Sequence, residues 1–134
     1  MFVADASITL AWFLDIPLAA DMRKSWETAS RSLIVVPAIW FMETQNGILK
    51  LIRQRRLDAV DAGNIRLELA LLSKRVDTEF THDAIDRTWE LANKHMLTFY
   101  DACYLELAWR LDVPLASLDS ALCRAAKTMK ISLH

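Results

Sequence analysis

Four carboxylates stand at the positions of this sequence best suited to shared chemistry. Asp5 and Asp119 each follow a short apolar run, Asp101 begins an expected helix, and Glu43 lies about two turns into another helix. Carboxylates that are brought together repel one another, and some take up protons unless a cation neutralises them. Ligation by carboxylates and water suits Mg²⁺ or Mn²⁺, and such an ion can activate a water for hydrolysis of a phosphodiester bond.

Each acid also has a purely structural interpretation, which the sequence leaves open. Asp5, Asp101 and Asp119 all stand where an aspartate commonly caps the first turn of a helix. Glu43 can be an exposed glutamate, but it follows Trp40 in an apolar neighbourhood, where a carboxylate needs a cation or hydrogen bonds. We interpret the four acids together as the catalytic and metal-binding residues.

Polar residues beside the acids are expected to support them. Ser7 and Ser117 can hold a metal-bound water or the second oxygen of an acid, or serve as ordinary hydroxyls of a turn and a strand end. Asn46 shares a helical face with Glu43, and Gly47 leaves room there for the close approach of another element.

Histidine and cysteine usage argues against other metal chemistry. A zinc or non-haem iron site is not expected, because the three histidines are scattered along the chain: His82, His95 and His134. Cys103 and Cys123 are too few for a disulfide framework and lack CxxC spacing, which favours reduced thiols.

Length and composition predict one cytoplasmic domain. The 134 residues suffice for a single core, and we expect one domain over residues 1–134. The formal net charge is -1, so any contact with nucleic acid needs a local basic patch. No basic region precedes the first apolar residues and no uncharged run is long enough for a bilayer, so we expect neither a signal peptide nor contact with a membrane.

Short apolar runs alternate with stretches of helical periodicity. Strands are expected at residues 2–4, 33–36, 75–77 and 114–118. Helices are expected from residue 7 and at 19–31, 37–55, 58–74, 82–95, 102–111 and 121–129, with Thr81 capping the helix at 82–95. This alternation predicts an α/β domain with a mainly parallel central sheet. Parallel strands end at one edge of the sheet, so the acids that follow them can converge there.

Four segments of the sequence carry a family resemblance. The start contains Asp5-Ala6-Ser7 after a strand, and Val36-Pro37 is followed by Glu43. The run 100–108 reads Tyr-Asp-Ala-Cys-Tyr-Leu-Glu-Leu-Ala, and 115–119 reads Leu-Ala-Ser-Leu-Asp. In this order they resemble the motifs of the PIN-domain nucleases, and within them the VapC-type toxins of bacterial type II toxin–antitoxin modules. The run 100–108 matches most closely, whereas Ser117 replaces a usual Thr and the Gly often found before the last strand is missing.

The resemblance implies properties that the residues alone do not. It implies a three-layer α/β/α PIN-like fold and an endoribonuclease that depends on Mg²⁺ or Mn²⁺. It also implies a homodimer and a cognate antitoxin that covers the site.

A basic cluster is the candidate for contact with RNA. Lys50, Arg53, Arg55 and Arg56 fall together at the end of the helix that carries Glu43, where they can meet phosphates. The alternative is a solvated helix end whose cations favour the C-terminal dipole.

Competing classes of protein fit less well. A phosphoacceptor signalling domain would need an acidic pair after the first strand and a Lys after the last strand, and this sequence has neither. A dinucleotide-binding domain needs a Gly-rich turn, and the only glycines are Gly47 and Gly63. The remaining alternative is a PIN-like domain that has lost activity and serves as a binding or scaffold module, against which the retention of all four acids argues.

Overall fold

A parallel sheet of short, buried strands forms the centre of the molecule. The computed structural model describes residues 1–14, 27 and 32–134. In that part of the chain, β1 (Phe2–Ala4), β2 (Ile34–Val36), β3 (Lys74–Val76) and β4 (Leu115–Ala116) pair in the order β3-β2-β1-β4, all parallel. Every residue of β1, β2 and β4 is buried, as continuous apolar strands require when helices cover both faces.

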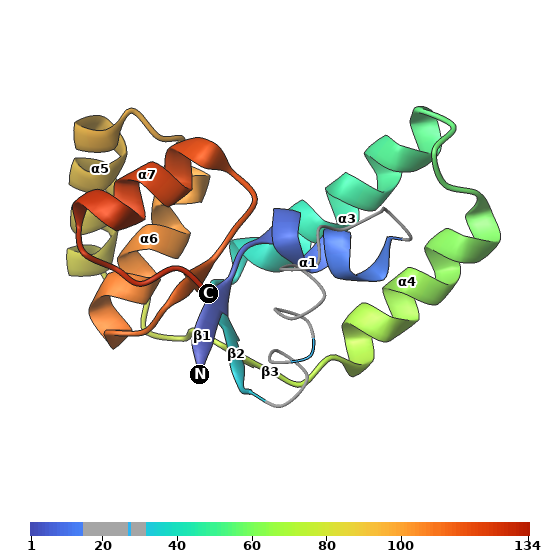
Figure 1. Cartoon of the computed structure of the whole chain (residues 1–134), viewed down its shortest axis with the longest axis horizontal. Helices are drawn as coiled ribbons and strands as arrows, with labels where there is room; N and C mark the ends of the chain where they lie inside the picture. Colours follow the sequence, from blue (N-terminus) through green and yellow to red (C-terminus); the bar gives the residue numbers. More distant parts are fainter. Residues whose placement is uncertain (15–26, 28–31) are drawn as a thin grey trace.

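Helices cover both faces of this sheet. The described helices are α1 (Ala6–Phe13), α3 (Ile39–Arg53), α4 (Ala59–Leu71), α5 (His82–His95), α6 (Phe99–Leu111) and α7 (Ser120–Thr128). In Figure 1, α1, α3 and α4 lie on one side of the strands and α5, α6 and α7 on the other. The predicted α/β class and its three-layer α/β/α arrangement are therefore confirmed. None of the described helices is long and apolar enough to cross a membrane.

Most element boundaries agree with the sequence to within a few residues. Thr81 caps α5 as predicted, its hydroxyl accepting from the backbone N–H of Ala84. α3 begins at Ile39 and not at Pro37, and Lys74 begins β3 where a helix was expected to end. The helix predicted at 19–31 lies outside the described residues, apart from Glu27.

One predicted cap was wrong. Asp101 does not cap α6, because Thr98 takes that position and the helix begins at Phe99. The backbone N–H of Asp101 donates to Thr98 Oγ1 at 3.0 Å, and the Thr98 hydroxyl donates to Asp101 Oδ2 at 2.6 Å. The correction places Asp101 inside the first turn of α6, where the helix dipole still favours its negative charge.

A buried ion-pair network fixes α6 against its neighbours. Glu106 of α6 is fully buried, and its carboxylate accepts from Arg87 of α5 and from Arg110, both at 3.0 Å. Arg110 also donates to Asp77, which follows β3, at 2.6 Å. A buried carboxylate that keeps two cationic partners avoids the large cost of an unpaired charge. The network thus holds in place the helix that carries Asp101.

Removal of one cation from this network is expected to destabilise the protein. Arg110→Met leaves the buried Glu106 with Arg87 alone, and we expect a loss of about 3 kcal/mol in the free energy of unfolding, measured by urea denaturation. The exposed Arg124 of α7 supplies a matched control, and Arg124→Met is expected to change stability by less than about 0.5 kcal/mol. Equal losses for the two variants would show that the network contributes nothing beyond ordinary surface pairing.

Candidate active site

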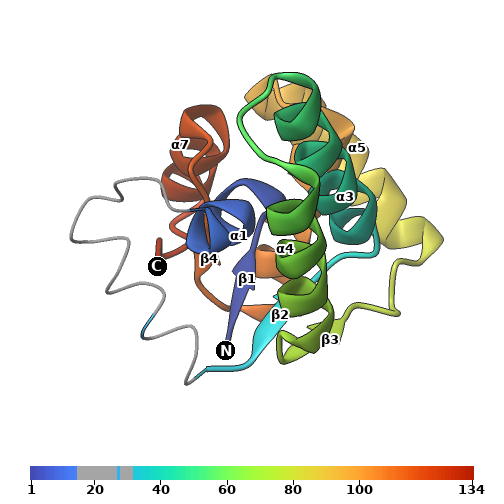
Figure 2. The ribbon, with the colours of Figure 1, turned by 90° about the vertical axis from the view of Figure 1, so that its right-hand side faces the viewer.

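The four predicted acids share one pocket at the carboxyl edge of the sheet. This acid pocket has a volume of about 290 Å³. Its lining includes Asp5, Glu43, Asp101 and Asp119, together with Ser7, Asn46, Leu10, Gly47 and Tyr104. Asp5 follows β1 directly and begins α1, which Figure 2 shows continuing from the end of that strand. Residues far apart in the sequence meet here because β1 and β4 are parallel neighbours.

Asp5 is the most deeply placed acid of the pocket. Its side chain is the N-cap of α1, with Oδ1 accepting from the backbone N–H of Ile8 at 2.9 Å, and the residue is only 4% exposed. The hydroxyls of Ser7 and Ser117 also donate to its carboxylate. Burial raises the pKa of Asp5, these hydrogen bonds lower it in part, and the charge of Asp101 raises it further.

The two serines named from the sequence both act on Asp5. Ser7 Oγ lies 2.7 and 2.9 Å from the two carboxylate oxygens of Asp5. Ser117, in the turn that follows β4, donates its hydroxyl hydrogen to Asp5 Oδ2. Ser7 Oγ accepts from the backbone N–H of Leu118 at 3.1 Å, and Ser117 Oγ accepts from that of Asp119 at 2.9 Å. The hydroxyls therefore tie the β1–α1 turn to the β4–α7 turn around the buried carboxylate.

Glu43 is held by a residue that sequence reasoning did not single out. It lies half-buried on α3, and the hydroxyl of Tyr104 on α6 donates to its Oε2. Burial raises the pKa of Glu43, the bond from Tyr104 lowers it, and the charges of Asp101 and Asp5 raise it. Tyr104 follows Asp101 by three residues and so shares its helical face, which was the available signal.

Asp101 and Asp119 are both less buried than Asp5. Asp101 is half-buried and paired with Thr98, as described above. Asp119 is exposed and caps α7, with Oδ1 accepting from the backbone N–H of Leu122 at 2.7 Å. The pocket therefore has a buried side with its acids fixed by hydroxyls and an open side facing solvent.

The arrangement limits how the acids can bind a cation. In the described ranges, no three His, Cys, Asp or Glu side chains lie close enough together to ligate one ion directly as placed. Mg²⁺ commonly keeps several waters and takes one or two carboxylates from the protein. Two direct carboxylates with water in the remaining positions therefore fit this donor set.

Close packing of α1 against α3 brings Glu43 towards Asp5. A Cβ atom on Gly47 would lie 2.4 Å from Leu10 Cδ1, so the missing side chain admits Leu10 at this crossing, as expected. The buried indole of Trp40 also donates to Thr9 Oγ1 at 3.1 Å, which links the two helices below the pocket.

Histidine and cysteine take no part in this pocket. In the described chain, the residues that line it include no histidine and no cysteine. Cys103 is buried, and burial together with the charges of Glu43, Glu106 and Asp101 raises the pKa of its thiol to about 12. The thiol therefore stays protonated and unreactive at neutral pH.

The basic cluster is exposed but not joined to the acids. Lys50 and Arg53 lie in the last turn of α3, Arg55 and Arg56 follow it, and none of them lines the acid pocket. The helix between Glu43 and Arg53 is about 15 Å long. A chain of several nucleotides could span that distance, whereas a single phosphate could not.

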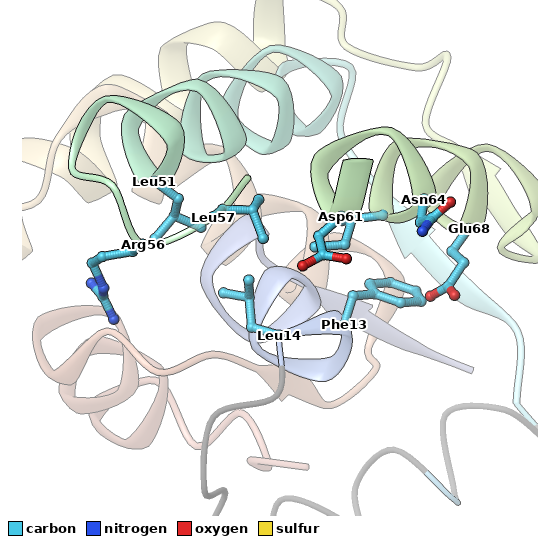
Figure 3. Close-up of a pocket in the computed structure, with 9 residues that line it drawn as sticks. Phe13, Leu14, Leu51, Arg56, Leu57, Asp61, Asn64 and Glu68 are labelled. Atoms are coloured by element: carbon cyan, nitrogen blue, oxygen red, sulfur yellow. The ribbon is translucent and has the colours of Figure 1, made fainter. Parts of the chain in front are cut away.

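A larger cavity elsewhere lacks the convergence of acids. It measures about 440 Å³ and lies between α1, α3 and α4, as Figure 3 shows. Its lining includes Phe13, Leu51 and Leu57, with Asp61 and Glu68 as its carboxylates. It shares no lining residue with the acid pocket, whose buried carboxylates of raised pKa are the better mark of a functional site.

Comparison with known proteins identifies the family. The PIN domain model matches residues 2–128, so the chain belongs to the PIN-domain family. Ribonuclease VapC1 of Mycobacterium tuberculosis is 40% identical over 70 residues, which are 51% of this chain and 51% of that protein. The matched segment thus spans about half the length of these curated relatives.

Solved structures share the fold at lower identity. A protein of Pyrobaculum aerophilum, PAE2754, superposes with a TM-score of 0.69 at 22% identity, covering 92% of this chain and 78% of that one. VapC20 of Mycobacterium tuberculosis, a toxin that cleaves the sarcin-ricin loop, gives 0.64 at 17%, covering 93% and 95%. A toxin–antitoxin complex from Klebsiella pneumoniae gives 0.60 at 17%, covering 90% and 88%.

Because the pKa of Asp5 is raised, we expect ionisation of its carboxyl group to lower the stability of the folded protein. As pH rises above the ordinary value of 3.8, the unfolded chain releases this proton more readily than the folded one, and the folded state loses stability until the raised pKa is passed. Asn caps a helix equally well and carries no charge. Without divalent cations, the unfolding free energy of Asp5→Asn relative to wild type should therefore increase between pH 4 and pH 7.

The control for this measurement is another capping aspartate. Asp58 caps α4 on the surface, with Oδ1 accepting from the backbone N–H of Asp61 at 2.8 Å. Urea denaturation in EDTA at the two pH values should show no comparable change for Asp58→Asn. A parallel change in both variants would contradict the attribution to burial of Asp5.

Proposed function

We propose that this chain is a metal-dependent endoribonuclease, and that the acid pocket is its active site. The observation that carries the proposal is the meeting of Asp5, Glu43, Asp101 and Asp119 in one pocket, where burial raises the pKa of two of them. Such an accumulation of negative charge favours a cation as the neutralising partner. Membership of the PIN-domain family and similarity to a ribonuclease support RNA as the substrate.

The residues of the acid pocket have different proposed roles in binding Mg²⁺ or Mn²⁺. When bound, the ion lowers the pKa of a water for attack on phosphorus and stabilises the leaving oxygen. Asp5 and Asp101 are proposed as direct ligands, while Glu43 and Asp119 hold water of the ion's shell. Ser7 and Ser117 fix the orientation of Asp5 through their hydrogen bonds. Asn46 lines the pocket beside Glu43 and can orient a substrate phosphate.

The biological role proposed is that of the toxin in a toxin–antitoxin module. One relative is named a VapC ribonuclease and one similar structure is a toxin–antitoxin complex, which supports a cognate antitoxin as partner. Exposed large apolar side chains such as Trp89, Met96 and Met42 offer area for such a partner or for a homodimer. A cytoplasmic location is part of the same proposal, because cellular RNA is there.

Loss of one acid is expected to abolish cleavage without unfolding the protein. Asp101→Asn removes a charge at the proposed metal site, and we expect RNA cleavage to fall on the order of 10³-fold or more, with the circular dichroism spectrum unchanged. Cleavage by wild type should require Mg²⁺ or Mn²⁺ and stop in excess EDTA. The matched control is Asp112→Asn at the other end of α6, where Asn tolerates the left-handed conformation of that residue.

Two results would refute this proposal in different ways. Undiminished cleavage in excess EDTA would exclude the metal mechanism. If wild type arrested growth on expression and Asp101→Asn did so equally, the inactive binding or scaffold module would be the better interpretation.

The basic cluster is expected to contribute to RNA affinity and its salt dependence. Arg53→Gln with Arg56→Gln removes two exposed cations, and the slope of log affinity against log salt should decrease by about 1.4 for single-stranded RNA. Binding is measured in the Asp101→Asn background, so that no RNA is consumed. Arg124→Gln with Lys127→Gln removes the same charge from α7 and should leave the slope nearly unchanged. Equal changes in both pairs would assign the effect to net charge alone.

A further inference from the structure

Tyr104 connects α6 to the acid on α3. It is 1% exposed and belongs to the hydrophobic core, yet its hydroxyl reaches the acid pocket and donates to Glu43 Oε2. The bond joins residues 61 positions apart in the sequence. It therefore couples the positions of two helices that each carry an acid.

The hydrogen bond restricts a side chain that would otherwise be mobile. A glutamate has three rotatable bonds, and holding it in one conformation costs entropy that an anchoring contact must offset. A hydroxyl that donates to a carboxylate makes a strong, charge-assisted bond. Because that bond uses Oε2, the second oxygen, Oε1, remains available to a cation or its water.

Tyr104 also stands close to the other acids. It follows Asp101 by three residues on α6, and it lines the acid pocket together with Ala6, the residue after Asp5. A displacement of this hydroxyl would therefore affect side chains of the pocket on three helices, α1, α3 and α6.

We propose that Tyr104 is the positioning residue of the active site, holding Glu43 in the orientation in which it contributes to cation binding. The inference rests on the proposed function, because it assumes that the acid pocket takes a divalent cation. The aromatic ring of Tyr104 packs in the hydrophobic core, whereas its hydroxyl donates to Glu43 in the acid pocket. The two roles can be separated, because Phe keeps the ring and removes only the hydroxyl.

The experiment compares Tyr104→Phe with the same substitution one turn earlier. Tyr100 is the other tyrosine of the chain, lies on the same helix and is 56% exposed. Mn²⁺ affinity of the RNA-free protein is measured by titration calorimetry at one pH. Tyr104→Phe should bind Mn²⁺ about tenfold more weakly than wild type, whereas Tyr100→Phe should bind it equally well.

A double-mutant cycle tests whether Tyr104 acts through Glu43. In the Glu43→Gln background, Tyr104→Phe should cause no further loss of Mn²⁺ affinity, because the carboxylate it orients is already absent. A further tenfold loss there would overturn the proposal, as would equal Mn²⁺ affinity for Tyr104→Phe and wild type. If Tyr104→Phe fails to fold, Glu43→Asp is used instead, because it keeps the negative charge but shortens the side chain that reaches Tyr104. Glu43→Asp should weaken Mn²⁺ binding by a similar factor. Unchanged Mn²⁺ binding by this variant would overturn the proposal.

Failure of the proposed function would give a different result. If wild type bound no Mn²⁺ at all, the metal-dependent mechanism and this inference would both be refuted. If wild type bound Mn²⁺ and all the tyrosine variants matched it, the mechanism would stand and only the role of Tyr104 would be refuted.

Discussion

Burial of the Asp5 carboxylate is the constraint on which the arrangement of the pocket depends. A carboxylate removed from water needs donors on every side, and here they come from Ile8, Ser7 and Ser117. Two of these donors belong to the first turn of α1, and the third follows β4. They can meet at one residue only because β1 and β4 are adjacent and parallel, with the backbone N–H of Asp5 donating to the carbonyl oxygen of Ala116 at 3.0 Å.

The pocket combines acids in unlike environments, and this difference matters for chemistry. Asp5 and Glu43 lose hydration and have raised pKa values, whereas Asp119 keeps its contact with solvent. Charged groups held in a desolvated site lower the stability of the folded state, a cost common at functional sites. The ion pairs of Glu106 with Arg87 and Arg110 stabilise α6, the helix whose Tyr104 donates to Glu43.

Sequence patterns predicted what depends on local residues and missed what depends on distant ones. The buried strands and the cap of α5 by Thr81 follow from neighbouring residues, and so they were predictable. Thr98 and Asp101 are both good caps three residues apart, and local preference does not decide between them. The helical spacing places Tyr104 on the same face as Asp101, but it does not predict the contact with Glu43, which exists only once α3 and α6 are brought together.

Capping and catalysis, which the sequence presents as alternatives for the aspartates, are compatible in this fold. In Asp5 and in Asp119, Oδ1 accepts from a backbone N–H at the start of a helix, which fixes the side-chain torsions. The second oxygen of each carboxylate is not used by the cap. In Asp5 the capping bond from Ile8 also lowers the pKa, which offsets part of the effect of burial. A cap can therefore also orient a ligand, because one hydrogen bond both begins the helix and fixes the direction of the second oxygen, which in Asp5 accepts from Ser7 and Ser117.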